Sequence, residues 1–398
     1  MRYSSGEKSS HSRRVNSILN VLLALIIIFY TAYGTGVSAY AEESITEADL
    51  EAYVYSAEGA EVFTAPDVST YYTSVPKNMI FHVTGITSNN FYRILFDNKT
   101  YYIYQGGVST MTDTYAYKLL GYQANAAYAV DLKTGTVLFD QNSLKRLEPA
   151  STTKVLTALI VLEACELGML TLDTPIAMTK SSLSSLPSDA SHVKPILKVG
   201  EVLTVRQMLE CLLISSDCHV ADRFAEVISG SKEKFAALMN LKAAQLGCVD
   251  TNFIEPSGYP DRKHYTNAYS LALIAKEALK YPVFREIVGS QKIVIPATNL
   301  TPERILNSTN LLLDSTSPYF NAAAKGLKTG TANRAGACLI TYGNDGVNEV
   351  ITVILGSGTR KMADGTTVKG QFYESGRLLN YALVTDALIK NQQAAGNH

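Results

Sequence analysis

A serine and a lysine three residues apart stand at the start of an apolar run, and together they can do nucleophilic chemistry. Ser151 and Lys154 open the run VLTALIVLEACELG, whose apolar and helix-forming residues predict a buried helix ending at Gly168. Residues three apart share one face of a helix, so the Lys154 amine can reach the Ser151 hydroxyl. Burial disfavours the charged form of a lysine, and such an amine can accept the serine proton. We therefore predict that Ser151 is a nucleophile and Lys154 its base.

The letters S-x-x-K are not specific by themselves, because an isolated copy is usually a helix cap followed by a solvated lysine. The same spacing recurs at Ser5, Ser74, Ser191, Ser229 and Ser231. Two further elements single out Ser151 by their order. Ser215-Ser216-Asp217 follows 64 residues later, and Lys328-Thr329-Gly330 follows after another 113. An earlier Lys133-Thr134-Gly135 precedes the nucleophile, and its glycine marks the turn of a predicted β-hairpin.

The three motifs and their flanks resemble those of the serine-type D-alanyl-D-alanine carboxypeptidases, which are penicillin-binding proteins of peptidase family S11. The resemblance covers residues 122 to about 385, and the segments that carry it are 149–154, 251–259, 264–269 and 326–331. It implies an α+β sandwich of the penicillin-binding/β-lactamase type, with an antiparallel sheet and a helical subdomain. Strand-like segments at both ends of this region, with helices between them, also predict a sheet built from distant parts of the chain.

The same resemblance implies an activity and a substrate. The expected reaction removes the terminal D-alanine from peptidoglycan stem pentapeptides through an acyl-enzyme on Ser151, and β-lactams would be covalent inhibitors. Ser215 would relay the proton toward the leaving amine, and the backbone N–H groups of Ser151 and Thr331 would form the oxyanion hole. Lys328 and Thr329 would hold the terminal carboxylate, while Gly330 lets the strand approach the substrate. No metal or organic cofactor is implied.

One residue departs from the family pattern. The middle motif normally ends in asparagine, where this chain has Asp217. A carboxylate only accepts hydrogen bonds, whereas an amide also donates them. Paired with Lys154, Asp217 would hold that amine in its charged form and weaken it as a base. We therefore expect slow turnover or an altered substrate preference, restored by Asp217→Asn. His219 is predicted on a helix surface, and Cys218 has no predicted catalytic role.

Two other functions remain open to test. A β-lactamase would carry a deacylating glutamate in the pattern E-x-x-L-N, and these letters occur at residues 303–307, but only shortly before Lys328. A weakly active or non-catalytic cell-wall binding protein is the second alternative, and Asp217 is the feature in its favour. Rapid nitrocefin turnover would favour the first alternative, and failure to form a penicillin adduct the second.

The sequence before residue 122 predicts export of the protein and a separate N-terminal module. Residues 1–41 resemble a signal peptide, with Lys8, Arg13 and Arg14 before an apolar run and Ala39-Tyr40-Ala41 as the cleavage pattern. The protein is thus expected outside the cytoplasm, secreted or held at the wall, and membrane-bound only if this segment stays uncleaved. Residues 45–112 read as short strands and resemble bacterial SH3-like modules, which would bind wall peptide or act as a spacer. We assign residues 113–121 to a linker, 122–390 to the carboxypeptidase domain and 391–398 to a polar tail without the trailing amphipathic anchor of some relatives.

Composition excludes some classes. A formal net charge of −1 without a Lys/Arg tract argues against a nucleic-acid-binding surface. The five cysteines are widely spaced and form neither a disulfide framework nor a C-x-x-C metal site, although one disulfide stays open. Cys165 and Cys211 lie in apolar helical context and are expected to pack as small hydrophobic residues.

Overall fold

The computed structural model describes residues 44–56, 59–75, 80–96, 99–110, 123–184, 190–362 and 365–395. The predicted signal peptide and the predicted linker lie outside these ranges. Within the ranges, no helix combines the length and the apolar character that a membrane crossing requires.

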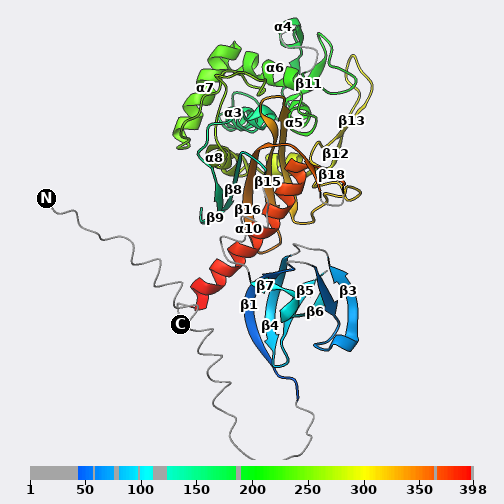
Figure 1. The fold of residues 1–398 in the computed structure, drawn as a ribbon. Coiled ribbons are helices and arrows are strands. Elements are labelled where there is room, and N and C mark those ends of the chain that lie inside the picture. Colours follow the sequence, from blue (N-terminus) through cyan, green and yellow to red (C-terminus); the bar gives the residue numbers. More distant parts are fainter. Residues whose placement is uncertain are drawn as a thin grey trace, which may run out of the picture.

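The N-terminal part is an all-β unit, drawn in blue and cyan in Figure 1. Its sheet has the order β3-β2-β6-β5-β4-β1-β7, with antiparallel neighbours. Alternating apolar residues point inward, so Val54, Val62, Val83, Ile94 and Ile103 are fully buried. The all-β prediction is confirmed, whereas the SH3-like assignment stays a prediction. The strands are β1 (Glu47–Tyr55), β2 (Ala60–Phe63), β3 (Tyr71–Val75), β4 (Ile80–Thr87), β5 (Phe91–Phe96), β6 (Lys99–Tyr104) and β7 (Ser109–Thr110).

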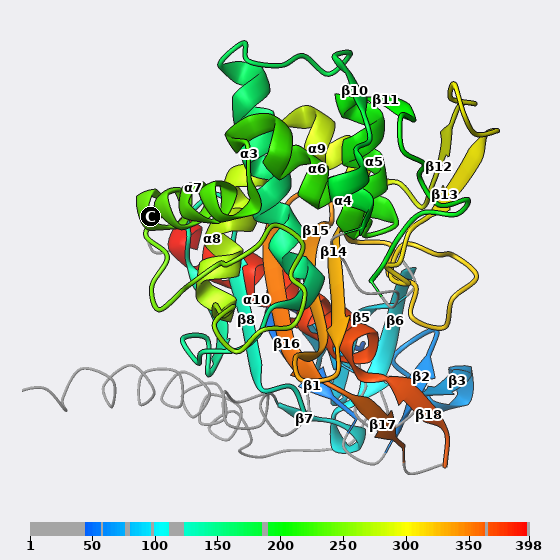
Figure 2. The same cartoon turned by 90° about the horizontal axis from the view of Figure 1, so that it is seen from above.

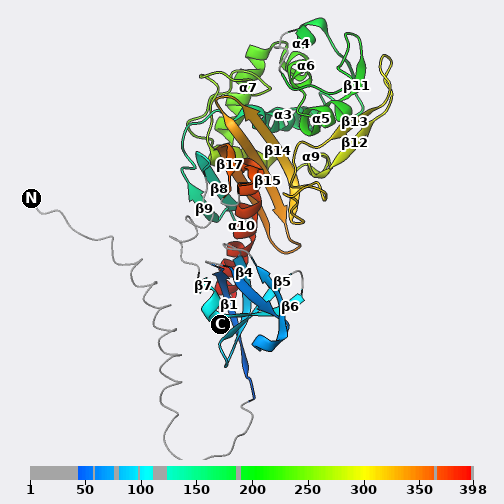
Figure 3. The same ribbon diagram turned by 45° about the vertical axis from the view of Figure 1, so that its right-hand side comes forward.

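The second part is built on a five-stranded antiparallel sheet with the order β14-β15-β16-β8-β9. Figure 3 shows strands from the start and from the end of this second part in one sheet. The prediction of a sheet assembled from distant segments is confirmed. The predicted hairpin is present as well, and Gly135 turns it with φ +75°. The strands are β8 (Ala126–Asp131), β9 (Val137–Gln141), β14 (Ala324–Ala332), β15 (Gly336–Asn344) and β16 (Glu349–Ser357).

Helices cover both faces of this sheet because its strands alternate apolar residues toward each side. Ile351 and Val353 pack with the helical subdomain, and Val350 and Ile354 pack under the C-terminal helix α10 (Gly370–Ala395). Figure 2 shows the subdomain and α10 separated by the sheet. The predicted α+β sandwich is therefore confirmed. The subdomain contains α3 (Lys154–Glu166), α4 (Lys180–Ser184), α5 (Val205–Ile214), α6 (Cys218–Ser229), α7 (Lys232–Gln245), α8 (Ala268–Ala278) and α9 (Pro282–Gly289).

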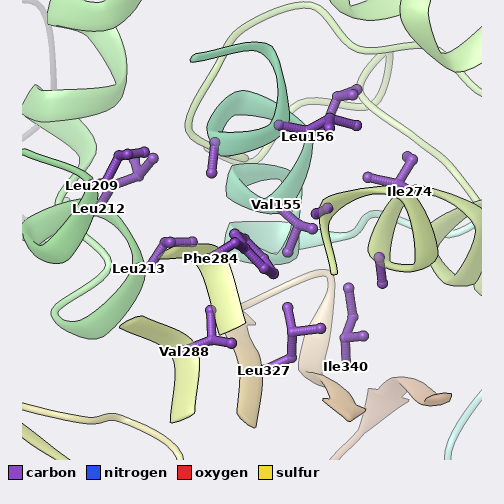
Figure 4. Packing of buried hydrophobic residues seen from close by; sticks show 14 of the residues in the cluster. Val155, Leu156, Leu209, Leu212, Leu213, Ile274, Phe284, Val288, Leu327 and Ile340 are labelled. Carbon is purple, nitrogen blue, oxygen red and sulfur yellow. The ribbon is translucent and has the colours of Figure 1, made fainter. Parts of the chain in front are cut away.

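Helix α3 is the centre of the larger core, as its sequence predicts. Val155 and Leu156 are fully buried, and Figure 4 shows them among side chains from α5, α8, α9 and the sheet. Removing such a side chain costs about 2–5 kcal/mol, so this packing holds the start of α3 in place. Gly168 follows the helix with φ +72°, in agreement with the predicted end.

Three two-stranded ribbons surround the sheet and the helices. They are β10 (Pro175–Ala177) with β11 (Val202–Thr204), β12 (Lys292–Ile295) with β13 (Arg304–Asn307), and β17 (Thr359–Lys361) with β18 (Thr367–Lys369). The second ribbon is tied down by an ion pair between Arg304 and Glu201, whose side chains are both fully buried. Burial alone would raise the pKa of Glu201, but hydrogen bonds from Arg304 and Thr298 lower it below its usual range.

Three expectations need revision or comment. Helix α10 continues to Ala395, so the predicted polar tail begins inside a helix, and its last three residues lie outside the described ranges. His219 is only 5% exposed and is no surface residue, because α6 turns it inward. All five cysteines are free, with Cys211 in the core and Cys165 half-buried.

Candidate active site

The structure brings Ser151 and Lys154 together as predicted. Ser151 lies in a 3-10 turn (Ala150–Thr153) that leads into α3, and Lys154 is the first residue of the helix. Lys154 Nζ is 2.8 Å from Ser151 Oγ, and the lysine side chain is fully buried. Ser151 itself stays partly open to solvent. An amine is thus held against a hydroxyl that a substrate can still reach.

Two other groups complete the surroundings of the Lys154 amine. It donates to the Ser257 carbonyl at 2.7 Å and lies 3.3 Å from Cys218 Sγ. The Ser257 carbonyl is held in place because the Glu255 carboxylate accepts from Ser257 N (2.9 Å), Ser257 Oγ (2.6 Å) and Tyr259 N (2.8 Å). The sequence analysis gave neither Ser257 nor Cys218 a role.

The turn that presents Ser151 is strained and tightly enclosed. Ala150 has φ +49°, a left-handed conformation that costs a non-glycine residue roughly 1–3 kcal/mol. Two glycines make room for it. A Cβ on Gly258 would lie 1.9 Å from the Ala150 carbonyl oxygen, and one on Gly330 would lie 3.0 Å from Ser151 N. Gly330 therefore allows a close approach to the backbone of the nucleophile's own turn, and its approach to the substrate stays a prediction.

The second motif is shifted by one residue from the predicted one. Ser215 is the C-cap of α5, and neither Ser215 nor Ser216 lines the cavity at Ser151, although the prediction made Ser215 the proton relay. Ser216 has φ +61°, and its hydroxyl is buried with no hydrogen-bond partner among the described residues. Cys218 lines the cavity. The geometry thus favours Ser216-Asp217-Cys218 as the middle motif.

Asp217 does not contact Lys154, contrary to the predicted pairing. It is the N-cap of α6: one carboxylate oxygen accepts from Val220 N at 3.0 Å and the other from Val193 N at 2.7 Å. Asp217 is fully buried, and His219 Nδ1 lies 3.7 Å from it. Aspartate is a favoured N-cap before an amphipathic helix, and this signal in the sequence could have placed Asp217 outside the site. The departure from the family's asparagine therefore falls on Cys218.

The third motif lies on the edge strand β14. Lys328 is buried and donates to its neighbour's carbonyl, Thr329 O, at 2.9 Å. Burial, together with the positive charge of Lys154, holds the pKa of Lys328 well below its usual range. Thr329 Oγ1 is 2.5 Å from Thr309 Oγ1, and Thr331 lines the cavity next to Ser151. Among the described strands β14 pairs only with β15 in this sheet, so its other edge has no strand partner and is of the kind to which an extended peptide can add.

A cavity of about 760 Å³ opens at Ser151. Its lining comes from the nucleophile's turn, the start of α6, the loop at Gly258, the end of β14 and the chain around β17 and β18. Glu303, the glutamate of the E-x-x-L-N letters, is exposed and does not line this cavity. Within the described residues, no group of three or more His, Cys, Asp or Glu side chains is arranged to hold a metal ion.

The fold and the site together define a class of proteins, the penicillin-recognising serine enzymes. They combine an antiparallel sheet, a helical subdomain and a serine–lysine pair at the start of a central helix next to an edge strand. Residues 113–359, more than half of the chain, match the family model of the D-alanyl-D-alanine carboxypeptidases, peptidase family S11. The chain belongs to this family, and the predicted resemblance is confirmed.

Curated relatives agree with this assignment. The chain is 33% identical over 250 residues to D-alanyl-D-alanine carboxypeptidase DacF of Bacillus subtilis, covering 63% of this chain and 61% of that protein. It is 30% identical over 272 residues to a D-alanyl-D-alanine carboxypeptidase of Streptomyces strain K15, covering 65% of this chain and 86% of the relative. The chain thus spans less than two thirds of the length of the Bacillus relative.

Solved structures also match. The DD-transpeptidase of Streptomyces K15 superimposes with a TM-score of 0.58 at 28% identity, over 66% of this chain and 97% of that one. Solved variants of that transpeptidase carry a serine-to-alanine and a cysteine-to-alanine substitution two positions apart. Ser216 and Cys218 have the same spacing.

Proposed function

We propose that this protein is a serine D-alanyl-D-alanine carboxypeptidase that removes the terminal D-alanine from peptidoglycan stem pentapeptides. One observation carries this proposal: the buried Lys154 amine lies 2.8 Å from Ser151 Oγ, at the edge of a cavity of about 760 Å³. Membership of the carboxypeptidase family supports the choice of substrate.

The reaction consists of two acyl transfers. Ser151 Oγ attacks the carbonyl carbon of the penultimate D-alanine while its proton passes to the Lys154 amine, and the C–N bond then breaks. The leaving D-alanine amine takes up a proton, and an ester on Ser151 remains. Water adds to this ester and its proton passes to the Lys154 amine. The C–O bond to Ser151 then breaks, Ser151 Oγ takes the proton back from Lys154, and the shortened peptide leaves.

The proton path to the leaving amine uses Ser216 in this proposal instead of Ser215. The Ser216 hydroxyl is buried and has no partner in the described part of the chain, so it is available for a proton in transit. Ser216 stands two residues before Cys218, whose Sγ lies 3.3 Å from the Lys154 amine, so the middle motif reaches the base.

The edge strand β14 binds the substrate in this proposal. Lys328 and Thr329 hold the terminal carboxylate, and the peptide lies along the open edge of the strand. The backbone N–H groups of Ser151 and Thr331 stabilise the oxyanion, since such donors act where negative charge develops. No cofactor takes part in these steps.

Adduct formation and product release test the proposal together. A penicillin should add its full mass to the protein, and Ser151→Ala should abolish this adduct. D-alanine release from a pentapeptide should also depend on Ser151. A protein that acylates but releases no D-alanine would contradict the carboxypeptidase activity. If it binds stem peptides without forming an adduct, the non-catalytic wall-binding alternative holds instead.

Transpeptidation is a second candidate, and the Ser216–Cys218 spacing favours it. The K15 DD-transpeptidase has a serine and a cysteine at this spacing, so the acyl group on Ser151 could pass to an amine. Incubation of a D-Ala-D-Ala ester or peptide with glycylglycine decides between the two. A transpeptidated product that outweighs the hydrolysed one supports this candidate, and exclusive hydrolysis removes it.

We further propose that the protein acts outside the cytoplasm at the cell wall. The signal-like segment at residues 1–41 and the expected peptidoglycan substrate both support this location. In this setting β-lactams are the expected covalent inhibitors. The N-terminal β unit would bind wall peptide or hold the enzyme near it.

A further inference from the structure

We infer that Lys369 forms a subsite for a carboxylate on the acyl side of the scissile bond, so that the enzyme prefers acidic stem peptides over amidated ones. This inference rests on the proposed function and names the chemistry that distinguishes one stem peptide from another.

Lys369 belongs to the wall of the cavity that contains Ser151, although it lies beyond the family match, which ends at residue 359. It is the last residue of β18, and in the β17–β18 ribbon it pairs with Thr359, which also lines the cavity. Gln371, at the start of α10, is a further lining residue. A segment outside the matched region thus contributes a cation and an amide to the site.

The backbone around Lys369 is held by hydrogen bonds, so the lysine side chain starts from a defined point at the cavity wall. Lys369 N donates to Tyr319 Oη at 2.8 Å, and the next residue, Gly370, donates from N to the Gly358 carbonyl at 2.8 Å. A Cβ on Gly370 would lie 2.2 Å from that carbonyl oxygen, so the glycine allows this close approach. The tyrosine ring also packs at 5.6 Å from that of Phe372.

The described wall of the cavity carries a positive charge that an anionic group of the substrate would balance. Among the residues that the structure describes, Arg334 and Lys369 are the charged ones in the lining, which there includes no Asp or Glu. Arg334 is paired with Glu148, which neutralises it. Lys369 is exposed, and its ammonium has no ion-pair partner in the part of the chain that the structure describes. A substrate carboxylate would complete the charge balance.

The direction of β14 decides which part of the substrate meets Lys369. In the proposed function the terminal carboxylate lies at Lys328 and Thr329, and neither of these residues lines the cavity. The cavity continues past Thr331 toward Arg334, in the opposite direction along the strand. A peptide extended along this edge therefore places its terminal carboxylate away from the cavity and its acyl side within it. The volume of about 760 Å³ leaves room for several residues.

The test uses two pairs of pentapeptides ending in D-Ala-D-Ala. Each pair differs only in whether one side chain carries a carboxylate or a carboxamide, at the residue before the D-alanines or at the one preceding it. The readout is the ratio of kcat/KM for D-alanine release between the members of a pair. Lys369→Gln should lower this ratio about three- to fivefold for one of the pairs, the upper end of the effect of a solvent-exposed ion pair.

Lys361→Gln is the matched control, because Lys361 is an exposed lysine on the other strand of the same ribbon and does not line the cavity. It should keep the ratio of the wild type. An unchanged ratio in Lys369→Gln for both pairs, or an equal fall in Lys361→Gln, would overturn the inference.

Binding without turnover separates this inference from the proposed function. The four peptides are titrated by calorimetry into Ser151→Ala and into Ser151→Ala/Lys369→Gln. If the wild type releases D-alanine from none of the peptides, the carboxypeptidase proposal fails. The affinity ratio still decides the subsite: a threefold or larger fall in the double variant supports it, and no change rejects it.

Discussion

Four consecutive residues, Ser215 to Cys218, determine how the chemistry at Ser151 is interpreted. Two serines allow two registers of the middle motif, and Asp217 resembles the asparagine of the family more closely than Cys218 does. Sequence letters cannot separate these registers, because only the start of α6 decides which side chain faces Lys154. Asp217 caps that helix, and the thiol of Cys218 takes the place beside the amine.

Replacing Cys218 and Asp217 by asparagine, one at a time, should separate their roles. Cys218→Asn provides a donor and an acceptor beside Lys154, so we expect D-alanine release to rise several-fold or the substrate preference to change. Asp217→Asn should leave kcat/KM within about twofold and lower the free energy of unfolding by about 1–3 kcal/mol. Asparagine caps a helix as well as aspartate does, but its amide nitrogen cannot accept from the buried Val193 N. Both are checked by steady-state kinetics and urea unfolding. A gain in turnover from Asp217→Asn alone would contradict this assignment.

Lys328 should set the alkaline limit of substrate binding. Burial and the charge of Lys154 lower its pKa, so its protonated form, which holds a carboxylate, is present below that lowered pKa and is lost as the pH rises through it. We expect kcat/KM to fall on the alkaline side well before the pH at which an ordinary lysine titrates. Lys328→Arg should move this limb to higher pH, because arginine remains charged. An alkaline limb at the same pH in both proteins would rule out Lys328.

At the scale of elements, the 3-10 turn at Ser151 depends on the loop and the strand that enclose it. The helix, the hairpin and the alternating strands followed from apolar periodicity, and they are present at the predicted places. The strained Ala150 and its tight contact with Gly258 could not be predicted, because they depend on segments more than a hundred residues apart. The sequence shows the glycine but not what lies against it.

Gly258→Ala tests this enclosure, and Gly230→Ala is its control. The two glycines have nearly the same backbone, φ +81° and φ +82°, but the Cβ of the first would lie 1.9 Å from Ala150 O and that of the second meets nothing within 4 Å. In both variants the backbone strain should lower the free energy of unfolding by roughly 1–3 kcal/mol. Only Gly258→Ala should also lower the rate of penicillin acylation, by at least about tenfold, since the nucleophile's turn must move. Equal acylation rates would show that the contact does not position Ser151.

At the scale of the whole molecule, the cores of the two parts are separate. The cluster around Val54 and Ile103 contains only residues of β1–β7 and their loops, whereas the clusters around α3 and α10 begin at Ala124. Composition and strand spacing predicted this division. They could not predict the ligand of the β unit, because no set of chemically distinctive residues stands out in its sequence.

A chain starting at residue 123 should therefore fold and react without the β unit. We expect it to form the fluorescent penicillin adduct at a rate within about twofold of the chain that starts at residue 44, with Ser151→Ala as the negative control in both lengths. The midpoint of thermal unfolding for the shorter chain should match one transition of the longer one. A shorter chain that aggregates or fails to acylate would show that the two parts depend on each other.

The pairing of β8 with β16 has a consequence for biogenesis. Val130 lies opposite Ile351, more than two hundred residues later, so the sheet cannot close until nearly the whole polypeptide has emerged. Contacts of such long range form slowly and leave hydrophobic surface exposed in the meantime. Under the proposed export, the chain passes its translocation channel before this sheet has closed. The proposed release of D-alanine then begins only after β16 has arrived.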